Sequence, residues 1–315
     1  MDFLSIPKFQ FENYFVKSNI LKNYSRQIRT VKLDDWQLKY FHLLIDIEKF
    51  VQLRSVRIQY FDEEMLHDFT QILLKLSRMK YLSYLHIEFS HVLVLENETV
   101  NMLKSLLLLS SLKTYILNNC RCPVVLDKND NKSNIEDLRL CLRSLFDFSA
   151  LSYCVPKIKS LSLSLQYNNK LHSSCYPIIV YDLRCLQKLE IRLKDTSFDE
   201  FECVLKQLSN LKELCFTSTS IDYINGQRWQ YLLSSLRTLK VFKFNIYLHY
   251  LNQSLINVEI MCSSFQNNFW FKREIFVGFD YYPCENSSTL FVYTLPYDKN
   301  EYRLGIGSFE SILSS

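Results

Sequence analysis

Glycine is the residue that this sequence most lacks. Its 315 residues include four glycines, at positions 226, 278, 305 and 307, about 1% where about 7% is usual. Phosphate-binding loops and tight active-site turns depend on glycine, because the backbone there takes positive φ angles or approaches a ligand closely. The shortage therefore argues against nucleotide-binding enzyme folds. Gly305 and Gly307 alone fall far short of a dinucleotide-binding fingerprint.

Sequence motifs for catalysis and metal binding are also missing. There is no G-x-S-x-G nucleophile elbow, the six histidines have no metal-binding spacing, and none of the ten cysteines forms a C-x-x-C pair. Residues 127–130 mix acidic and basic side chains, but they lack the glycine and terminal glutamate of a calcium loop. We therefore expect no enzyme activity, no cofactor and no metal. An enzyme whose active site combines residues distant in the sequence stays open as an alternative.

Signals for secretion and membrane insertion are absent from the sequence. The N-terminus has no basic segment, long apolar segment or small-residue cleavage site. The longest apolar run, near 103–112, is interrupted by lysine and serines and is shorter than the about 20 residues that cross a bilayer. We expect an intracellular protein, cytoplasmic or nuclear, with reduced cysteines. Cys185, Cys203 and Cys215 fall within the repeat pattern, where a thiol acts as a small buried apolar group.

The overall charge is weakly positive. The chain has a net charge of +4, and its lysines and arginines are spread among acidic neighbours. A nucleic-acid surface requires a continuous basic patch, so these charges indicate an ordinary solvated surface. We expect neither a nucleic-acid nor a membrane partner.

A short apolar pattern recurs along most of the chain. The stretch 186–216 contains an apolar-x-x-apolar-x-apolar strand, a helix-start signal, an amphipathic helix and then the same strand pattern again. Nine copies of the pattern begin at residues 28, 53, 82, 112, 135, 158, 186, 211 and 239, in steps of 23 to 30 residues. Weaker copies follow at 255–260 and 290–295. These steps are typical of leucine-rich repeats.

The segments between the predicted strands support this interpretation. Apolar residues at helical spacing predict one-faced helices over 36–50, 62–79, 99–109, 198–208 and 229–236, with Gly226 in the turn before the last. A strand-helix unit of this length cannot bury its own apolar faces, so such units are stable only when stacked. The sequence predicts an α/β leucine-rich-repeat solenoid, or horseshoe, with a curved parallel sheet on the concave side and helices on the convex side.

The predicted organisation has three parts. Residues 1–27 form an N-terminal cap or linker remnant, 28–261 the repeats, and 262–315 an aromatic, β-rich C-terminal cap and tail, because helical periodicity is lost after residue 262. The polar segment 118–134 is predicted to be a surface loop in a helix-poor repeat.

The candidate binding residues come from the strand pattern. Side chains alternate between the two faces of a strand, so the leucines point inward and the residues between them line the concave face. His86 lies between Leu85 and Ile87, where it would be either a binding contact or, as the simpler interpretation, a solvated side chain. The mixed signs of this face suit a folded protein partner. The candidate partner-binding residues are Lys32, Arg57, Tyr84, His86, Glu88, Ser162, Lys188, Glu190, Arg192, Glu213 and Lys243.

Several segments resemble one known family. They read NYSRQIRTVKLDD (23–35), FVQLRSVRIQYFDEE (50–64), LKQLSNLKELCFTSTSIDYINGQRWQYLLSSLRTLKVFKF (205–244), FWFKREIFVGFDYYP (269–283) and TLFVYTLPY (289–297). Together they are similar to F-box-associated leucine-rich repeat proteins. The specific part is D-Y-I-N-G-x-x-W at 222–229, followed by the aromatic end of the chain.

The resemblance implies a ubiquitin-ligase role. Members of that family usually begin with an F-box that docks on the Skp adaptor of a cullin-RING ligase, while the repeats capture the substrate. Residues 1–27 contain no L-P-x-E/D-L-L helix start, so the F-box is expected to be lost or to lie outside this sequence. The expected function is a non-catalytic protein-interaction module, with substrate recognition for an SCF-type ligase as its sharper form. The alternative is a repeat-protein inhibitor or scaffold without a ubiquitin role.

Overall fold

The computed structural model describes most of the repeat region. The described residues are 10, 23–38, 47–61, 63–93, 95, 97–120, 132–142, 144–165, 180, 183–194, 196–251, 258–282 and 288–295. The predictions for residues 1–22, for most of 118–134 and for the chain after residue 295 lie outside these ranges. The chain divides into two compact units, one of residues 1–141, 153–158 and 306–315, the other of 142–152 and 159–305.

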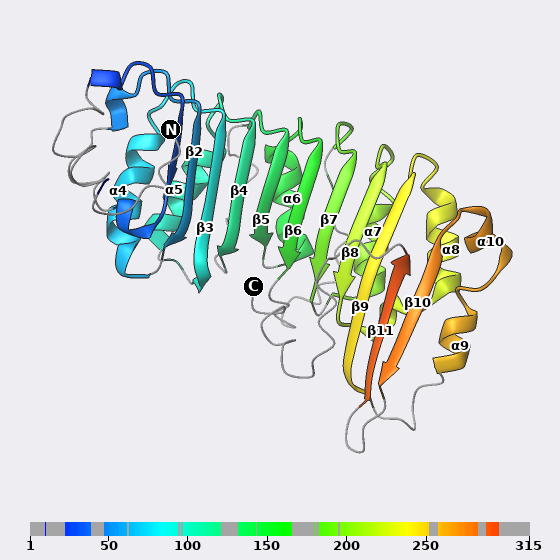
Figure 1. Ribbon diagram of the computed structural model, residues 1–315. Coiled ribbons are helices and arrows are strands. Elements are labelled where there is room, and N and C mark those ends of the chain that lie inside the picture. Colours follow the sequence, from blue (N-terminus) through cyan, green and yellow to red (C-terminus); the bar gives the residue numbers. More distant parts are fainter. Residues whose placement is uncertain are drawn as a thin grey trace. The chain divides into compact units, whose positions relative to one another are not determined.

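The fold is mixed α/β, with a mostly parallel sheet of 11 strands and helices. In the first unit, neighbouring strands are parallel and follow the chain order. They are β1 (Thr30–Leu33), β2 (Ser55–Phe61), β3 (Tyr84–Leu93), β4 (Thr114–Cys120) and β5 (Asp137–Leu142). Its helical segments are the 3-10 helices η2 (Ile47–Lys49) and η3 (Glu63–Met65) and the α-helices α4 (Leu66–Leu76) and α5 (Asn97–Leu107) (Figure 1).

In the second unit, four parallel strands are followed by an antiparallel hairpin. The parallel strands are β6 (Ser160–Leu165), β7 (Lys188–Leu193), β8 (Glu213–Ser218) and β9 (Val241–Leu251). Strand β11 (Ser288–Leu295) lies between β9 and β10 (Phe276–Tyr282) and is antiparallel to both. The helices are α6 (Leu145–Cys154), whose last two residues belong to the first unit, α7 (Phe198–Leu205), η5 (Ile221–Tyr223), α8 (Gly226–Ser235), α9 (Val258–Ser263) and α10 (Asn268–Lys272).

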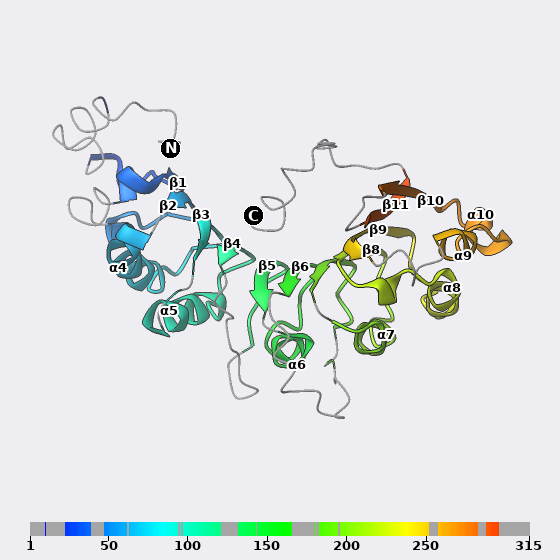
Figure 2. The same ribbon diagram turned by 90° about the horizontal axis from the view of Figure 1, so that it is seen from below.

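The alternation of side chains places the core between sheet and helices in each unit. Along β6, β7 and β8, every second residue is buried, and Leu161, Leu189 and Leu214 are at most 1% exposed. Figure 2 shows α4 and α5 on one side of the first unit's strands, and α7 and α8 on one side of the second unit's strands. The predicted inward and outward positions are therefore confirmed in these strands.

The same backbone contact recurs where successive strands begin. The carbonyl of Arg29 accepts hydrogen bonds from the N–H groups of Arg54 and Ser55, and the carbonyl of Arg54 accepts from Ser83 and Tyr84. Equivalent pairs of bonds end on the carbonyls of Ser83, Lys113, Lys159, Gln187 and Lys212. The same local geometry thus recurs at these seven carbonyls.

Most predicted helices are confirmed. Helices α4, α5, α7 and α8 lie within or close to the predicted ranges, and α7 begins with a capping box between Ser197 and Glu200. This box satisfies two N–H groups that a helix start leaves without intrahelical partners. In the predicted helix 36–50, residues 35–38 are helical, 47–49 form η2 and 39–46 lie outside the described ranges.

The motif at 222–229 forms a turn and the first part of α8. Asn225 caps α8 by accepting a hydrogen bond from the N–H of Arg228, and Trp229 is fully buried. The Trp229 indole donates to the carbonyl of Tyr223 at 2.9 Å, and the Tyr223 hydroxyl contacts the carbonyl of Thr196 at 3.1 Å. Buried hydrogen bonds and aromatic contacts therefore connect the start of α8 to the segment that precedes α7.

Several predictions were wrong. Helix α6 (Leu145–Cys154) was missed, and residues 258–260, predicted as part of a weak strand, begin α9. Helix α10 lies within the segment expected to have lost helical structure. Cys185 is exposed, and Cys203 and Cys215 are half-buried rather than buried. The described cysteines form no disulfide. No helix in the described ranges is long and apolar enough to cross a membrane.

Gly226 was also interpreted wrongly, because it is the first residue of α8 and not part of the preceding turn. A Cβ atom built there would lie 2.3 Å from the carbonyl oxygen of Ser264. Real Cβ contacts are not that short, so glycine at this position permits close packing of α8 against the segment after α9.

Candidate functional site

In each unit, the predicted binding residues lie on the strand face opposite the helices. In the first unit these are Lys32, Arg57, Tyr84, His86 and Glu88, and in the second they are Ser162, Lys188, Glu190, Arg192, Glu213 and Lys243. We call the outward positions of β1–β5 the first strand face and those of β6–β9 the second strand face. That these residues bind a partner remains a prediction.

A row of basic side chains crosses the first strand face. Strand register places Lys32 opposite Arg57 and Arg57 opposite His86, while Ile116 lies between His86 and Arg139. Directly opposed residues on neighbouring strands lie on the same face. Tyr84 belongs to a separate row with Ser55 and Thr114.

His86 is the centre of a polar network. Its Nε2 atom lies 3.6 Å from Glu88 Oε2 and 3.4 Å from the Asn118 amide nitrogen. The Gln59 amide nitrogen donates a hydrogen bond to the same Glu88 oxygen at 2.9 Å. Residues from three strands and from two adjacent levels of the sheet are thus joined.

Burial determines the ionisation of His86. The residue is only 6% exposed, so the interpretation of His86 as a solvated side chain is wrong. Burial, reinforced by the positive charge of Arg57, lowers the His86 pKa to about 4, although Glu88 acts in the opposite direction. The imidazole is therefore neutral at pH 7. Its Nδ1 atom and the Nε atom of Arg57 are buried without hydrogen-bond partners, which makes this cluster costly to maintain.

The second strand face carries charges of both signs. Lys188 Nζ lies 3.6 Å from Glu213 Oε2, and both side chains are nearly half exposed. One level further along the strands, Ser162, Glu190, Cys215 and Lys243 are successive partners in register. Burial, together with the charge of Glu190, raises the pKa of the Cys215 thiol, so this cysteine is not an activated nucleophile.

Sequence reasoning missed part of both faces. Arg139 was not among the candidates, although alternation within its strand pattern would have identified it as outward. The outward positions of β9 continue past Asn245 to Tyr247, which lies opposite Phe291 of β11. Pairing between β9 and β11 is not encoded in the repeat pattern, so no sequence signal joined these aromatic residues.

The helix side of the second unit offers a weaker candidate for a binding site. A shallow hollow is lined by Glu202, Asn225, Gln227, Arg228 and Tyr231. The Arg228 guanidinium forms ion pairs with Asp199 and with Glu202 and lies over the Phe198 ring. This arginine therefore connects α7 to α8.

Metal binding has no support within the described ranges. No group of three histidine, cysteine, aspartate or glutamate side chains there could hold a metal ion. The acidic segment 127–130 lies outside those ranges.

No protein-family model matches the chain, and no curated protein matches it either. The similarity to F-box-associated leucine-rich repeat proteins therefore remains a prediction from the quoted segments.

Proposed function

We propose that this protein is a leucine-rich-repeat solenoid of horseshoe form that binds a protein partner through its two strand faces. The recurring double hydrogen bond at the strand starts, from Arg29 to Lys212, supports a repeated stacking unit. Such repeats use their strand faces as extended binding surfaces.

The polar composition of the strand faces is the observation that carries this proposal. Outward positions hold basic, acidic, amide and hydroxyl groups in register, while no described helix covers them (Figure 2). Mixed charges favour a folded protein over a polyanion, because binding a polyanion requires positive charge along its whole length.

The sharper form of the proposal is substrate recognition for an SCF-type ubiquitin ligase. It rests on the resemblance of residues 222–229, 269–283 and 289–297 to F-box-associated leucine-rich repeat proteins. Capture of the protein expressed from its own gene in cells tests this form, because absence of Skp and cullin subunits from the captured complex would remove it. The alternative, an inhibitor or scaffold without a ubiquitin role, would stand if a partner still bound the strand faces.

Affinity capture with mass spectrometry tests the general proposal. The lysines Lys32, Lys188 and Lys243 lie on the strand faces, whereas Lys75, Lys104 and Lys206 lie on or next to helices. Replacing the first three with glutamate should remove specific partners, and replacing the last three should not. Equal loss in both triple variants, with both folded by circular dichroism, would contradict the proposal.

A further inference from the structure

Strand β10 ends the sheet in the second unit (Figure 1). In the described part of the chain it pairs only with β11, over all seven of its residues and without a register shift. Alternate residues of such a strand direct their N–H and C=O groups away from the neighbouring strand. Outside this ladder, the described residues form no backbone hydrogen bond with Phe276, Val277, Phe279, Tyr281 or Tyr282. One side of β10 can therefore accept a further strand.

The sequence of β10 lacks the features that usually protect a sheet edge. Proteins block such edges with lysine, proline or a β-bulge. The strand reads FVGFDYY, which contains neither lysine nor proline, and its pairing with β11 has no bulge. Its single charged residue is Asp280. Most of the edge is therefore apolar or aromatic, a composition that favours association with another strand.

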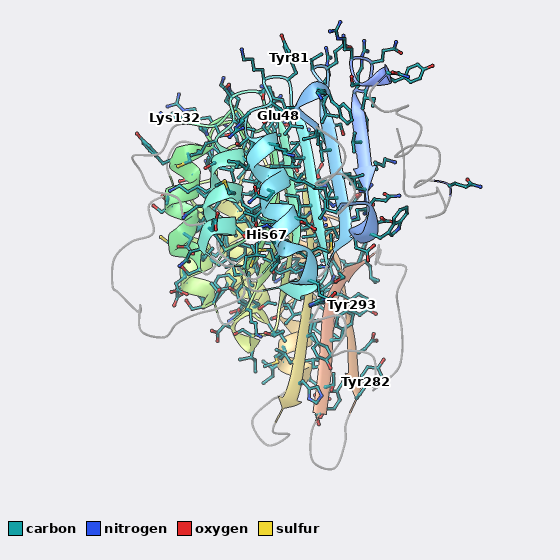
Figure 3. The ribbon with its side chains drawn as sticks, turned by 90° about the vertical axis from the view of Figure 1, so that its left-hand side faces the viewer. Glu48, His67, Tyr81, Lys132, Tyr282 and Tyr293 are labelled. Atoms are coloured by element: carbon teal, nitrogen blue, oxygen red, sulfur yellow. The ribbon has the colours of Figure 1, made fainter. Side chains whose placement is uncertain are left out.

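Aromatic side chains are exposed along this edge. Phe276 is 50% exposed, Tyr281 39% and Tyr282 45%. Figure 3 shows Tyr282 near the end of β10. At the start of the strand, Phe271 of α10 is also exposed, and its ring lies 6.5 Å from the Phe276 ring. Tyrosine and phenylalanine are enriched in protein interfaces, so the side chains as well as the backbone of β10 suit a protein strand.

The strand is complementary to a second copy of itself. Two antiparallel copies overlap over all seven residues only when Phe279 lies opposite Phe279 of the second copy. That register places Phe276 opposite Tyr282 of the second copy, and Val277 opposite Tyr281. Directly opposed aromatic pairs and pairs of an aromatic with a β-branched residue stabilise a sheet.

Charge favours the same register. It places Asp280 opposite Gly278 of the second copy, whereas sliding one copy by two residues would place Asp280 opposite Asp280. Like charges directly opposite each other are unfavourable. Sliding by two residues in the other direction would leave Tyr281 and Tyr282 beyond the end of the second strand. A slip of one residue would turn opposed side chains to different faces.

We propose that two copies of this chain associate through β10, antiparallel around a two-fold axis at Phe279, so that the sheets of their second units join. The two-fold axis limits the assembly to two subunits, because the same edge serves both copies. This inference goes beyond the proposed function and does not depend on it, because β10 belongs to neither the first nor the second strand face.

Sedimentation equilibrium of the full chain tests the association. The buffer contains a reductant, so that intermolecular disulfides do not contribute. A pair of seven-residue strands is a small interface, so we expect a micromolar dissociation constant, measurable between about 1 and about 100 µM protein. Phe276→Lys and Tyr282→Glu should each weaken the dimer about tenfold, because each removes an aromatic pair at both ends of the interface. Tyr231→Lys, at an exposed tyrosine of α8, is the matched control and should change it less than about twofold.

Mixing the two edge variants tests the register. In a mixed dimer, the lysine introduced by Phe276→Lys faces the glutamate introduced by Tyr282→Glu, while the other end keeps its original aromatic pair. We expect the mixture to dimerise about fivefold more tightly than either variant alone. Circular dichroism of each variant checks that the fold is retained.

Four results would overturn this inference. They are a monomer at every concentration, assemblies larger than a dimer, a dimer weakened as much by Tyr231→Lys as by the edge variants, or a mixture that binds no more tightly than the separate variants. None of these variants alters the strand-face lysines, so such a failure would leave the proposed function standing.

Discussion

The ring of Tyr293 lies directly over Gly278 on the neighbouring strand. This contact uses one of only four glycines in the chain, in a strand interior, where glycine normally weakens the structure. Gly226 uses another for close backbone packing. Gly278 is packed against a side chain, whereas Gly226 is packed against backbone atoms of Ser264.

The substitutions Gly226→Ala and Gly278→Ala should have unequal effects on stability. At Gly226 the added methyl meets the backbone of Ser264, which cannot move away without displacing its segment, so we expect a loss of about 2–3 kcal/mol. At Gly278 the methyl meets a side chain that can rotate, so we expect a loss below about 1 kcal/mol. Urea unfolding of both variants measures the difference. Equal losses would show that Ser264 yields as easily as a tyrosine ring.

The buried hydrogen bonds of the 222–229 motif should contribute to stability. Tyr223→Phe removes the hydroxyl that contacts the carbonyls of Thr196 and Ser197, with an expected loss of about 1 kcal/mol. Trp229→Ala removes a fully buried side chain and should lose about 3–5 kcal/mol. Tyr231→Phe, at an exposed residue of the same helix, is the control. Thermal unfolding would contradict this prediction if all three variants matched the wild type.

Alternation within β7 predicts opposite outcomes for neighbouring residues. Leu189 is 1% exposed, whereas Glu190 is half-buried on the strand face. Leu189→Asp buries an unpaired charge and should cost several kcal/mol, while Glu190→Lys should fold normally. Soluble yield and circular dichroism measure both. A soluble, folded Leu189→Asp variant would be incompatible with this packing.

Stability should depend on the ionisation of His86. Its folded-state pKa is about 4, below the ordinary value of 6.5, so the unfolded chain binds the proton more tightly. The contribution of His86 to the free energy of unfolding is therefore largest above pH 6.5. The free energy of unfolding falls by about 1–3 kcal/mol as the pH falls from 6.5 toward 4. His86→Gln should flatten the pH dependence of unfolding in this interval. An unchanged slope would show that other groups cause it.

Much of the fold could be predicted from sequence because alternation and repeat period act locally. Leu189 and Glu190 differ in burial as their positions in the strand pattern require. Helix α6 was missed because its sequence is apolar around most of its surface and lacks a one-sided stripe. The segment at 258–260 fits the strand pattern by composition, yet it is helical.

The candidate site could be predicted only in part. The outward positions follow from alternation, but the burial of His86 depends on its neighbours Arg57 and Asn118, which are distant in the sequence. The pairing of Tyr293 with both Asn245 and Gly278 requires an antiparallel return of the chain. No local pattern specifies such a return.

Lysine footprinting of the protein bound to its captured partner tests the binding role of the strand faces most directly. Acetylation of Lys32, Lys188 and Lys243 should fall in the complex, because the partner covers the faces on which they lie. Acetylation of Lys75, Lys104 and Lys206 should stay unchanged. Protection of the helix lysines together with full labelling of the strand-face lysines would contradict the proposed binding surface.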